Sequence, residues 1–206
     1  MKFYFIRHGE TIWNKLGKIQ GWEDSPLTIK GAQQSLINGQ YLNGMGIELL
    51  LSSPLGRAAT SAQIISRVID IEPTFHNELK EMNFGQWSEK TFTEIKVEYP
   101  ELWDKRNMDI YGFRNPDGES YRDVEQRGIL FIDTIMEKLE DTVAIVSHEG
   151  IEKTMIGYLL DMPKEDMLKI RHPQHIIYFL DSGTQSYGYI NTSNGATILN
   201  ELVRDK

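Results

Sequence analysis

Cysteine is absent from the chain of 206 residues. Without a thiol the protein has no disulfide, no cysteine-ligated zinc or iron–sulfur centre and no cysteine nucleophile, which excludes the cysteine-based phosphatases. A reducing compartment fits this composition, and we therefore predict a cytoplasmic protein.

Basic residues are outnumbered, with 22 Lys and Arg against 30 Asp and Glu and a formal net charge of −8. Proteins that bind nucleic acid or an anionic membrane need a broad basic face, so we expect neither partner. An anionic substrate would have to be bound by a few locally placed cations.

Long hydrophobic runs are also missing. The apolar segments 129–132 and 143–146 have the length of core elements and are too short to cross a bilayer. The N-terminal apolar run, residues 3–6, is interrupted by Arg7 and does not resemble a signal peptide. The sequence predicts a soluble protein.

Short apolar runs, typical of buried strands, alternate with segments of helical period. The expected strands are 3–6, 47–51, 143–146 and 176–180, the expected helices are 29–42, 55–69, 120–139 and 151–160, and residues 187–202 are expected to form a hairpin. This order predicts an α/β fold of three layers, α/β/α, with a mainly parallel sheet, helices on both faces and a C-terminal hairpin. The length fits one domain, residues 1–206.

Residues 82–118 interrupt the alternation and hold seven of the 21 aromatic residues. We interpret this segment as a helical insertion with a small core of its own, which serves as a cap over a site.

Basic and polar residues follow three of the predicted strands. Arg7 and His8 follow the first strand, Arg57 follows the second, and His148 follows strand 143–146. Ligands of open parallel sheets lie beyond the carboxyl ends of the strands, so these side chains are expected to converge. Guanidinium groups match phosphoryl oxygens, which makes a phosphoryl group the best candidate ligand.

The sequence lacks the common motifs of phosphate and acyl chemistry. It has no G-x-x-x-x-G-K loop, no G-x-S-x-G elbow and no D-x-D pair. A histidine is then the obvious nucleophile, because a neutral imidazole attacks through one ring nitrogen when the other is held as a donor. The leaving oxygen would still need a proton from a nearby carboxyl group.

Ordered sequence blocks over residues 2–150 extend this pattern. They are RHGET at 7–11 with Asn14, G-x-x-D-x-P-L-T-x-x-G at 21–31, SSPLGRA at 52–58, ELKE at 78–81 followed by Phe84, Gly85 and Trp87, and PDGES at 116–120 with VSH at 146–148. Together they resemble the histidine phosphatase superfamily in its phosphoglycerate-mutase-like branch, of the short phosphatase type.

The resemblance implies a role for each matching residue. His8 would be the phosphorylated nucleophile, while Arg7, Arg57 and His148 would hold the phosphoryl oxygens. Glu81 would be the proton donor and later the base, although Glu78, one turn earlier, is an alternative. No metal and no cofactor is implied.

Four further residues are candidates for binding substrate or phosphate. Asn14 would add a phosphate contact, and Gln20 and Gly21 fall where the family lines the substrate. Glu149 stands where the family usually has a small residue. Because a carboxylate facing phosphate would repel it, we expect the Glu149 side chain to turn outward, with only its backbone N–H near the ligand.

The expected function is that of a metal-independent phosphomonoesterase, acting through a phosphohistidine on a small phosphorylated metabolite. Phosphoglycerate mutase is an alternative, because Lys105-Arg106 is similar to a basic pair that binds a carboxylate in the mutases. However, only 66 residues separate Glu81 from His148, whereas the mutases carry a longer insertion there. A catalytically weak phospho-ligand-binding protein is a further alternative, and a homodimer is left open.

Overall fold

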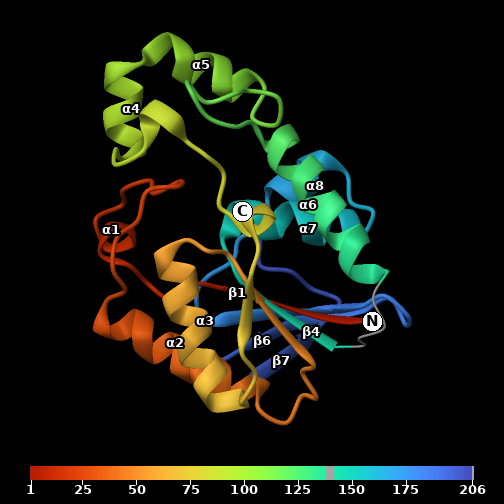
Figure 1. The fold of residues 1–206 in the computed structure, drawn as a ribbon. Helices are drawn as coiled ribbons and strands as arrows, with labels where there is room; N and C mark the ends of the chain where they lie inside the picture. The colour runs from red at the N-terminus through yellow and green to blue at the C-terminus, as the bar shows by residue number, and fades with distance from the viewer. Residues whose placement is uncertain (138–141, 206) are drawn as a thin grey trace.

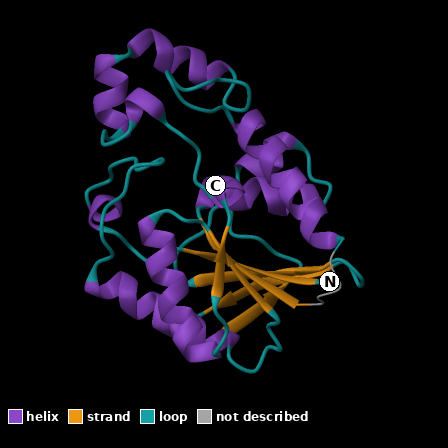
Figure 2. Cartoon of the chain, viewed as in Figure 1, coloured by secondary structure: helices purple, strands orange, loops and turns teal. Residues whose placement is uncertain are grey.

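The computed structural model describes residues 1–137 and 142–205 and shows a mixed seven-stranded sheet with helices on both faces (Figures 1 and 2). The order of the strands is β3-β2-β4-β1-β5-β6-β7. The strands are β1 (Lys2–Arg7), β2 (Leu49–Ser52), β3 (Pro73–Phe75), β4 (Thr142–Ser147), β5 (Ile176–Asp181), β6 (Ser186–Asn191) and β7 (Ala196–Leu199). Strands β1 to β4 are mutually parallel, while β5, β6 and β7 extend the sheet in antiparallel pairs. The predicted three-layer fold is confirmed.

The helices occupy both faces of this sheet and the region beyond its carboxyl edge. They are α1 (Ile12–Lys15), α2 (Ile29–Leu42), α3 (Gly56–Ile69), α4 (Phe92–Glu98), α5 (Pro100–Met108), α6 (Tyr121–Met136), α7 (Glu149–Leu159) and α8 (Lys164–Leu168). None of these described helices is long and apolar enough to cross a membrane.

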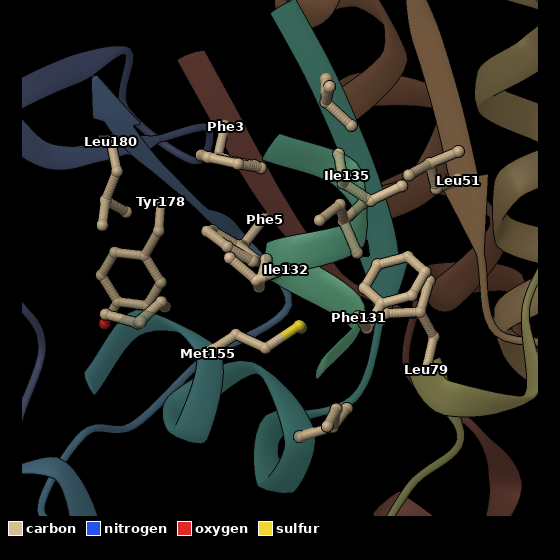
Figure 3. Close-up of a cluster of buried hydrophobic side chains, with 14 of the residues drawn as sticks. Phe3, Phe5, Leu51, Leu79, Phe131, Ile132, Ile135, Met155, Tyr178 and Leu180 are labelled. Carbon is tan, nitrogen blue, oxygen red and sulfur yellow. The ribbon is translucent and has the colours of Figure 1, made fainter. Parts of the chain in front are cut away.

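Two hydrophobic cores hold the layers together. Side chains of β1 alternate between them: Phe3 and Phe5 pack toward α6 and α7, and Ile6 packs on the α2 and α3 side. The first core also contains Phe131, Ile132 and further side chains drawn in Figure 3. Because both faces of β4 are buried, Thr142–Ser147 is a nearly continuous apolar run, as expected of a central parallel strand.

Helix starts follow the capping signals in the sequence. Thr28 accepts a hydrogen bond from the Gly31 N–H at the start of α2. Ser120 and Asp123 form a reciprocal capping box at the start of α6. The predicted end of this helix at Leu139 lies outside the described residues.

The segment 82–118 carries α4 and α5, which lie apart from the sheet (Figure 1). A small apolar cluster of Ile19, Trp87 and Ile95 fixes it to the loop after α1, and the rings of Trp87 and Phe113 are stacked with centroids 5.4 Å apart. The segment is therefore held in place by its own packing.

The sequence did not predict three short elements, β3, α1 and α8. They span three to five residues each. Elements of this length contain fewer than two periods of a hydrophobic pattern, so local sequence carries little signal for them.

Close backbone contact explains the glycine that follows His8. A Cβ on Gly9 would lie 2.1 Å from the carbonyl oxygen of Gly31, and one on Gly31 would lie 2.1 Å from that of Glu10. The first turn of α2 therefore packs directly on the backbone after β1, and this contact sets the position of the segment that carries His8.

We predict that Gly31→Ala destabilises the protein by about 1–3 kcal/mol, because the added methyl group has to push two backbone segments apart. Urea unfolding of this variant measures the effect. Gln33→Ala, at an exposed position of the same helix, is the matched control and should change stability by less than about 0.5 kcal/mol. Equal stability of the two variants would contradict the close contact.

Candidate active site

The predicted convergence at the carboxyl edge of the sheet is present. Strands β1 and β4 are parallel neighbours with Arg7 paired to Ser147, and the His8 N–H donates to the Ser147 carbonyl oxygen at 3.0 Å. His8 and His148 therefore lie side by side, with ring centroids 5.1 Å apart. Arg57 enters the same space from the first turn of α3.

The imidazole of His8 is held in one tautomer. Its Nδ1 lies 2.8 Å from the Gly9 carbonyl oxygen, which can only accept, so Nδ1 carries the proton. The lone pair on Nε2 then accepts from Nε of Arg57 at 3.3 Å. His8 presents a neutral, oriented Nε2, the form required of a nucleophile.

Arg57 is a buried cation, and each of its three guanidinium nitrogens donates a hydrogen bond. Nη2 donates to the Gly21 carbonyl oxygen at 2.8 Å, and Nη1 donates to the Glu23 carbonyl oxygen and to Asp24 at 2.8 and 3.0 Å. The Asp24 carboxylate also accepts from the backbone N–H groups of Gly56 and Arg57, where α3 begins. This anchoring fixes Nε toward His8.

His148 is fully buried and is oriented by Ser53. Its Nε2 lies 2.9 Å from the Ser53 hydroxyl, which also accepts from the Leu55 N–H at 3.3 Å. In the tautomer in which Ser53 donates to Nε2, the proton of His148 is on Nδ1, which is buried without a hydrogen-bond partner among the described residues. A buried donor of this kind calls for an acceptor, and a phosphoryl oxygen beside His8 would supply it.

Positive surroundings and burial keep both histidines neutral. Burial, followed by the charges of Arg57 and Arg7, holds the pKa of His8 well below its usual 6.5. Burial, then Arg57 and His8, does the same to the pKa of His148.

Of the two candidate acids, Glu81 lies in the site and Glu78 is exposed outside it. The Glu81 carboxylate accepts from the Met82 N–H at 2.8 Å and from the Gly150 N–H at 3.3 Å. Burial raises the pKa of Glu81 above 4.5, although these N–H donors and Arg57 act in the opposite direction. The carboxyl group is thereby suited to hold a proton for the leaving oxygen.

These groups line a cavity of about 390 Å³, and residues of the segment 82–118 form part of its wall. Its wall contains six cationic side chains and three acidic ones, although the whole protein has a net charge of −8. The lining residues are Arg7, His8, Asn14, Lys18, Ile19, Gln20, Gly21, Arg57, Glu81, Met82, Phe84, Phe92, Arg106, Ile110, Phe113, Asn115, Tyr121, Glu149, Gly150, Lys153, Leu168, Arg171 and Asp205.

The three secondary candidates Asn14, Gln20 and Gly21 all line this cavity. The Oδ1 of Asn14 takes part in the capping box of α1, where it accepts a hydrogen bond from the Thr11 N–H at 3.1 Å. Gln20 accepts from the Ser25 hydroxyl at 3.0 Å. Their amide nitrogens remain the groups suited to an anionic ligand.

The expected outward orientation of Glu149 is wrong. Its side chain is only 13% exposed and lines the cavity, where the carboxylate binds Nη1 of Arg7 at 2.8 Å. Arg171 and Lys153 lie at 2.8 and 3.8 Å from its other oxygen. Three cations therefore offset the repulsion on which the expectation was based.

Several residues of the site were missed by sequence reasoning. Ser53 and Asp24 lie within the quoted motif blocks, so their presence there was a signal for a positioning role. Lys153, Arg171 and Asp205 carried no such signal, because only the packing of α7 and the C-terminal segment brings them to the cavity.

Comparison with known proteins agrees with this geometry. The model of the histidine phosphatase superfamily (branch 1) matches residues 3–190. A probable phosphoglycerate mutase, GpmB, of Citrobacter koseri is 33% identical over 177 residues, which cover 84% of this chain and 81% of that protein.

Solved structures of phosphatases share the whole fold. The α-ribazole phosphatase of Shigella flexneri has a TM-score of 0.83 and 28% identity, covering 100% of this chain and 96% of that one. The phosphoserine phosphatase of Entamoeba histolytica, in complex with 3-phosphoglyceric acid, has a TM-score of 0.75 and 29% identity, covering 100% and 98%.

The depressed pKa values of His8 and His148 predict that the protein loses stability as the pH falls below about 6.5. Below this pH the histidines of the unfolded chain become protonated, whereas the buried imidazoles of the folded protein stay neutral. The free energy of unfolding therefore falls by up to about 2 kcal/mol for each histidine at pH 5. Urea unfolding between pH 7.5 and 5 measures this loss. His8→Asn should show a shallower decline than the wild type, and an identical decline would contradict a neutral buried His8.

Proposed function

The chain belongs to the histidine phosphatase superfamily, and from this premise we propose that it hydrolyses phosphate monoesters of small metabolites through a phosphohistidine on His8. The observation that carries the proposal is the fixed, neutral imidazole of His8, with Nε2 against Arg57 and the cavity beside it. No metal ion takes part in the proposed steps.

In the first step the lone pair of His8 Nε2 attacks phosphorus. A nitrogen–phosphorus bond forms, the bond from phosphorus to the leaving oxygen breaks, and Glu81 gives its proton to that oxygen. Arg57, Arg7 and the Nδ1–H of His148 would bind the equatorial oxygens, where charge gathers.

In the second step water releases the phosphoryl group. The Glu81 carboxylate takes a proton from water, the oxygen of water bonds to phosphorus, and the nitrogen–phosphorus bond breaks to restore neutral His8. The products are inorganic phosphate and an alcohol.

The cavity supports a small organic phosphate as the substrate. Its apolar wall comes largely from the segment 82–118, which we propose acts as a cap over one domain of residues 1–206, with Phe84, Phe92 and Phe113 beside the basic end. Arg106 also lines the cavity, and because a guanidinium group binds carboxylates, phosphorylated acids are included among the proposed substrates. Hydrolysis is favoured over mutase activity by the phosphatases among the similar solved structures.

Location and assembly complete the proposal. A cytoplasmic location is supported by the absence of cysteine, and the charge of −8 disfavours nucleic acid and membrane as partners. A homodimer stays part of the proposal, and sedimentation of the purified protein would decide it.

We predict metal-independent hydrolysis of p-nitrophenyl phosphate in the presence of a chelator, with His8→Ala reducing kcat by at least about 10³-fold because the nucleophile is lost. Quenched reactions should contain phosphohistidine, which is stable in base and labile in acid. Retained turnover in His8→Ala would refute the covalent route. Conversion of 3-phosphoglycerate to its 2-isomer faster than phosphate release would instead favour the mutase alternative.

The raised pKa of Glu81 predicts that hydrolysis of alkyl phosphates declines as the pH rises through that pKa, because the carboxyl group loses the proton the leaving oxygen needs. Glu81→Gln should remove this decline and lower kcat/KM for O-phosphoserine, which reports the steps up to formation of phosphohistidine, by about 10²–10⁴-fold. p-Nitrophenyl phosphate is the matched control, since its phenolate leaves without a proton and its kcat/KM should fall much less, whatever happens to the later hydrolysis step. Equal losses on the two substrates would contradict Glu81 as the acid.

A further inference from the structure

The carboxylate of Glu149 is fixed from both oxygens. Oε2 accepts from Nη1 of Arg7 at 2.8 Å and from the backbone N–H of His172 at 3.3 Å. Oε1 lies 2.8 Å from Nη1 of Arg171 and 3.8 Å from Nζ of Lys153. These contacts hold the side chain within the cavity wall and leave it little freedom to swing toward a bound phosphoryl group.

The guanidinium of Arg7 is anchored along one edge only. Both of its side-chain hydrogen bonds within the described residues come from Nη1, to Glu149 and to the His172 carbonyl oxygen at 3.0 Å. Its Nε is buried and has no partner there. Because buried donors are normally satisfied, this unpartnered edge, which belongs to a side chain lining the cavity beside His8, points to an anion as the missing partner.

His172, whose backbone contacts both Arg7 and Glu149, is itself held in place. The imidazole of His172 is 1% exposed and lies between the Glu152 carboxylate and the Ile176 carbonyl oxygen, which is 2.9 Å from Nε2. Glu152 in turn accepts from the Ser147 hydroxyl at 2.9 Å. The backbone of His172, which contacts both Arg7 and Glu149, is thereby tied to the end of β4 that precedes His148.

We propose that Glu149 is a positioning residue for the reaction: it holds Nη1 of Arg7 against His172 so that the remaining N–H donors of the guanidinium face the phosphoryl group on its way to His8. Arg171 and Lys153 neutralise the carboxylate, so it orients Arg7 without repelling the substrate. This inference rests on the proposed phosphatase function and adds a residue that the chemistry of the nucleophile and acid does not require.

Orthovanadate, which resembles the transferring phosphoryl group, separates positioning from repulsion. If Glu149 orients Arg7, Glu149→Gln and Glu149→Ala should raise the inhibition constant of vanadate and lower kcat/KM for p-nitrophenyl phosphate, each by about 10–100-fold. If the carboxylate repels anions or masks Arg7, both variants should bind vanadate more tightly. Unchanged or tighter binding overturns the proposal.

Two features keep the test valid even if a Glu149 variant is partly unfolded. An inhibition constant does not depend on the concentration of active enzyme, so a partly unfolded variant would still report the affinity of its folded fraction. Glu165→Gln removes the same charge from an exposed position on α8 and should leave the vanadate constant and kcat/KM within about twofold of wild type.

A double-variant cycle tests whether Glu149 acts through Arg7. Lysine is a single point charge and cannot bridge Glu149 and a phosphoryl group as a fork can. In an Arg7→Lys background, Glu149→Gln should therefore change the vanadate constant by less than about twofold. The full 10–100-fold effect in that background would overturn the proposal.

The outcomes also separate this inference from the proposed function. A wild-type protein that forms phosphohistidine while its Glu149 variants bind vanadate normally would retain the function and lose the inference. For a wild-type protein without turnover, which would refute the proposed function, calorimetric titration with vanadate still tests the orientation of Arg7 by the same comparison of variants.

Discussion

A buried guanidinium group must be bonded on every side, and the position of Arg57 in this site follows from that requirement. With 2% of its surface exposed, Arg57 takes backbone carbonyl oxygens from the loop after α1 and a carboxylate oxygen from Asp24. Nε meets Nε2 of His8, and Nη2 has a second N–H besides the one that it donates to Gly21. The loop, the start of α3 and the nucleophile are thereby fixed relative to one another, and the cavity forms around them.

The same logic extends to the other charged groups of the cavity. Arg7 is anchored at one edge by Glu149, and His148 by Ser53, so that each keeps a donor without a protein partner among the described residues. Donors held in advance at low dielectric stabilise developing charge without reorganisation during the reaction. An acidic protein can bind a phosphate dianion in this way, because its few converging cations are already oriented.

Sequence reasoning found the parts of the site that follow from strand order. Parallel strands end at one edge, so the residues after β1 and β4, including His8 and His148, could be placed together without coordinates. Helices that begin at a clear capping residue, such as the helix after Thr28, could also be predicted from the sequence. The family resemblance supplied Glu81, which strand order alone would not have identified.

What the sequence could not supply depends on packing between distant segments. The orientation of Glu149 was predicted wrongly because Arg171, which binds it, lies 22 positions further along the chain and reaches the cavity only through the fold. The close contact between Gly9 and Gly31 likewise joins segments 22 positions apart, and it became visible only in the fold. Elements as short as β3 escaped detection because three residues are too few to establish a periodic pattern.

A crystal structure with orthovanadate tests the central claim most directly, namely that Nε2 of His8 receives the phosphoryl group among oriented cations. We predict vanadium bonded to Nε2 of His8, with its equatorial oxygens accepting from Arg57, from the free edge of Arg7 and from Nδ1 of His148. Vanadate bonded to another residue, or bound in the cavity without contact to His8, would contradict it.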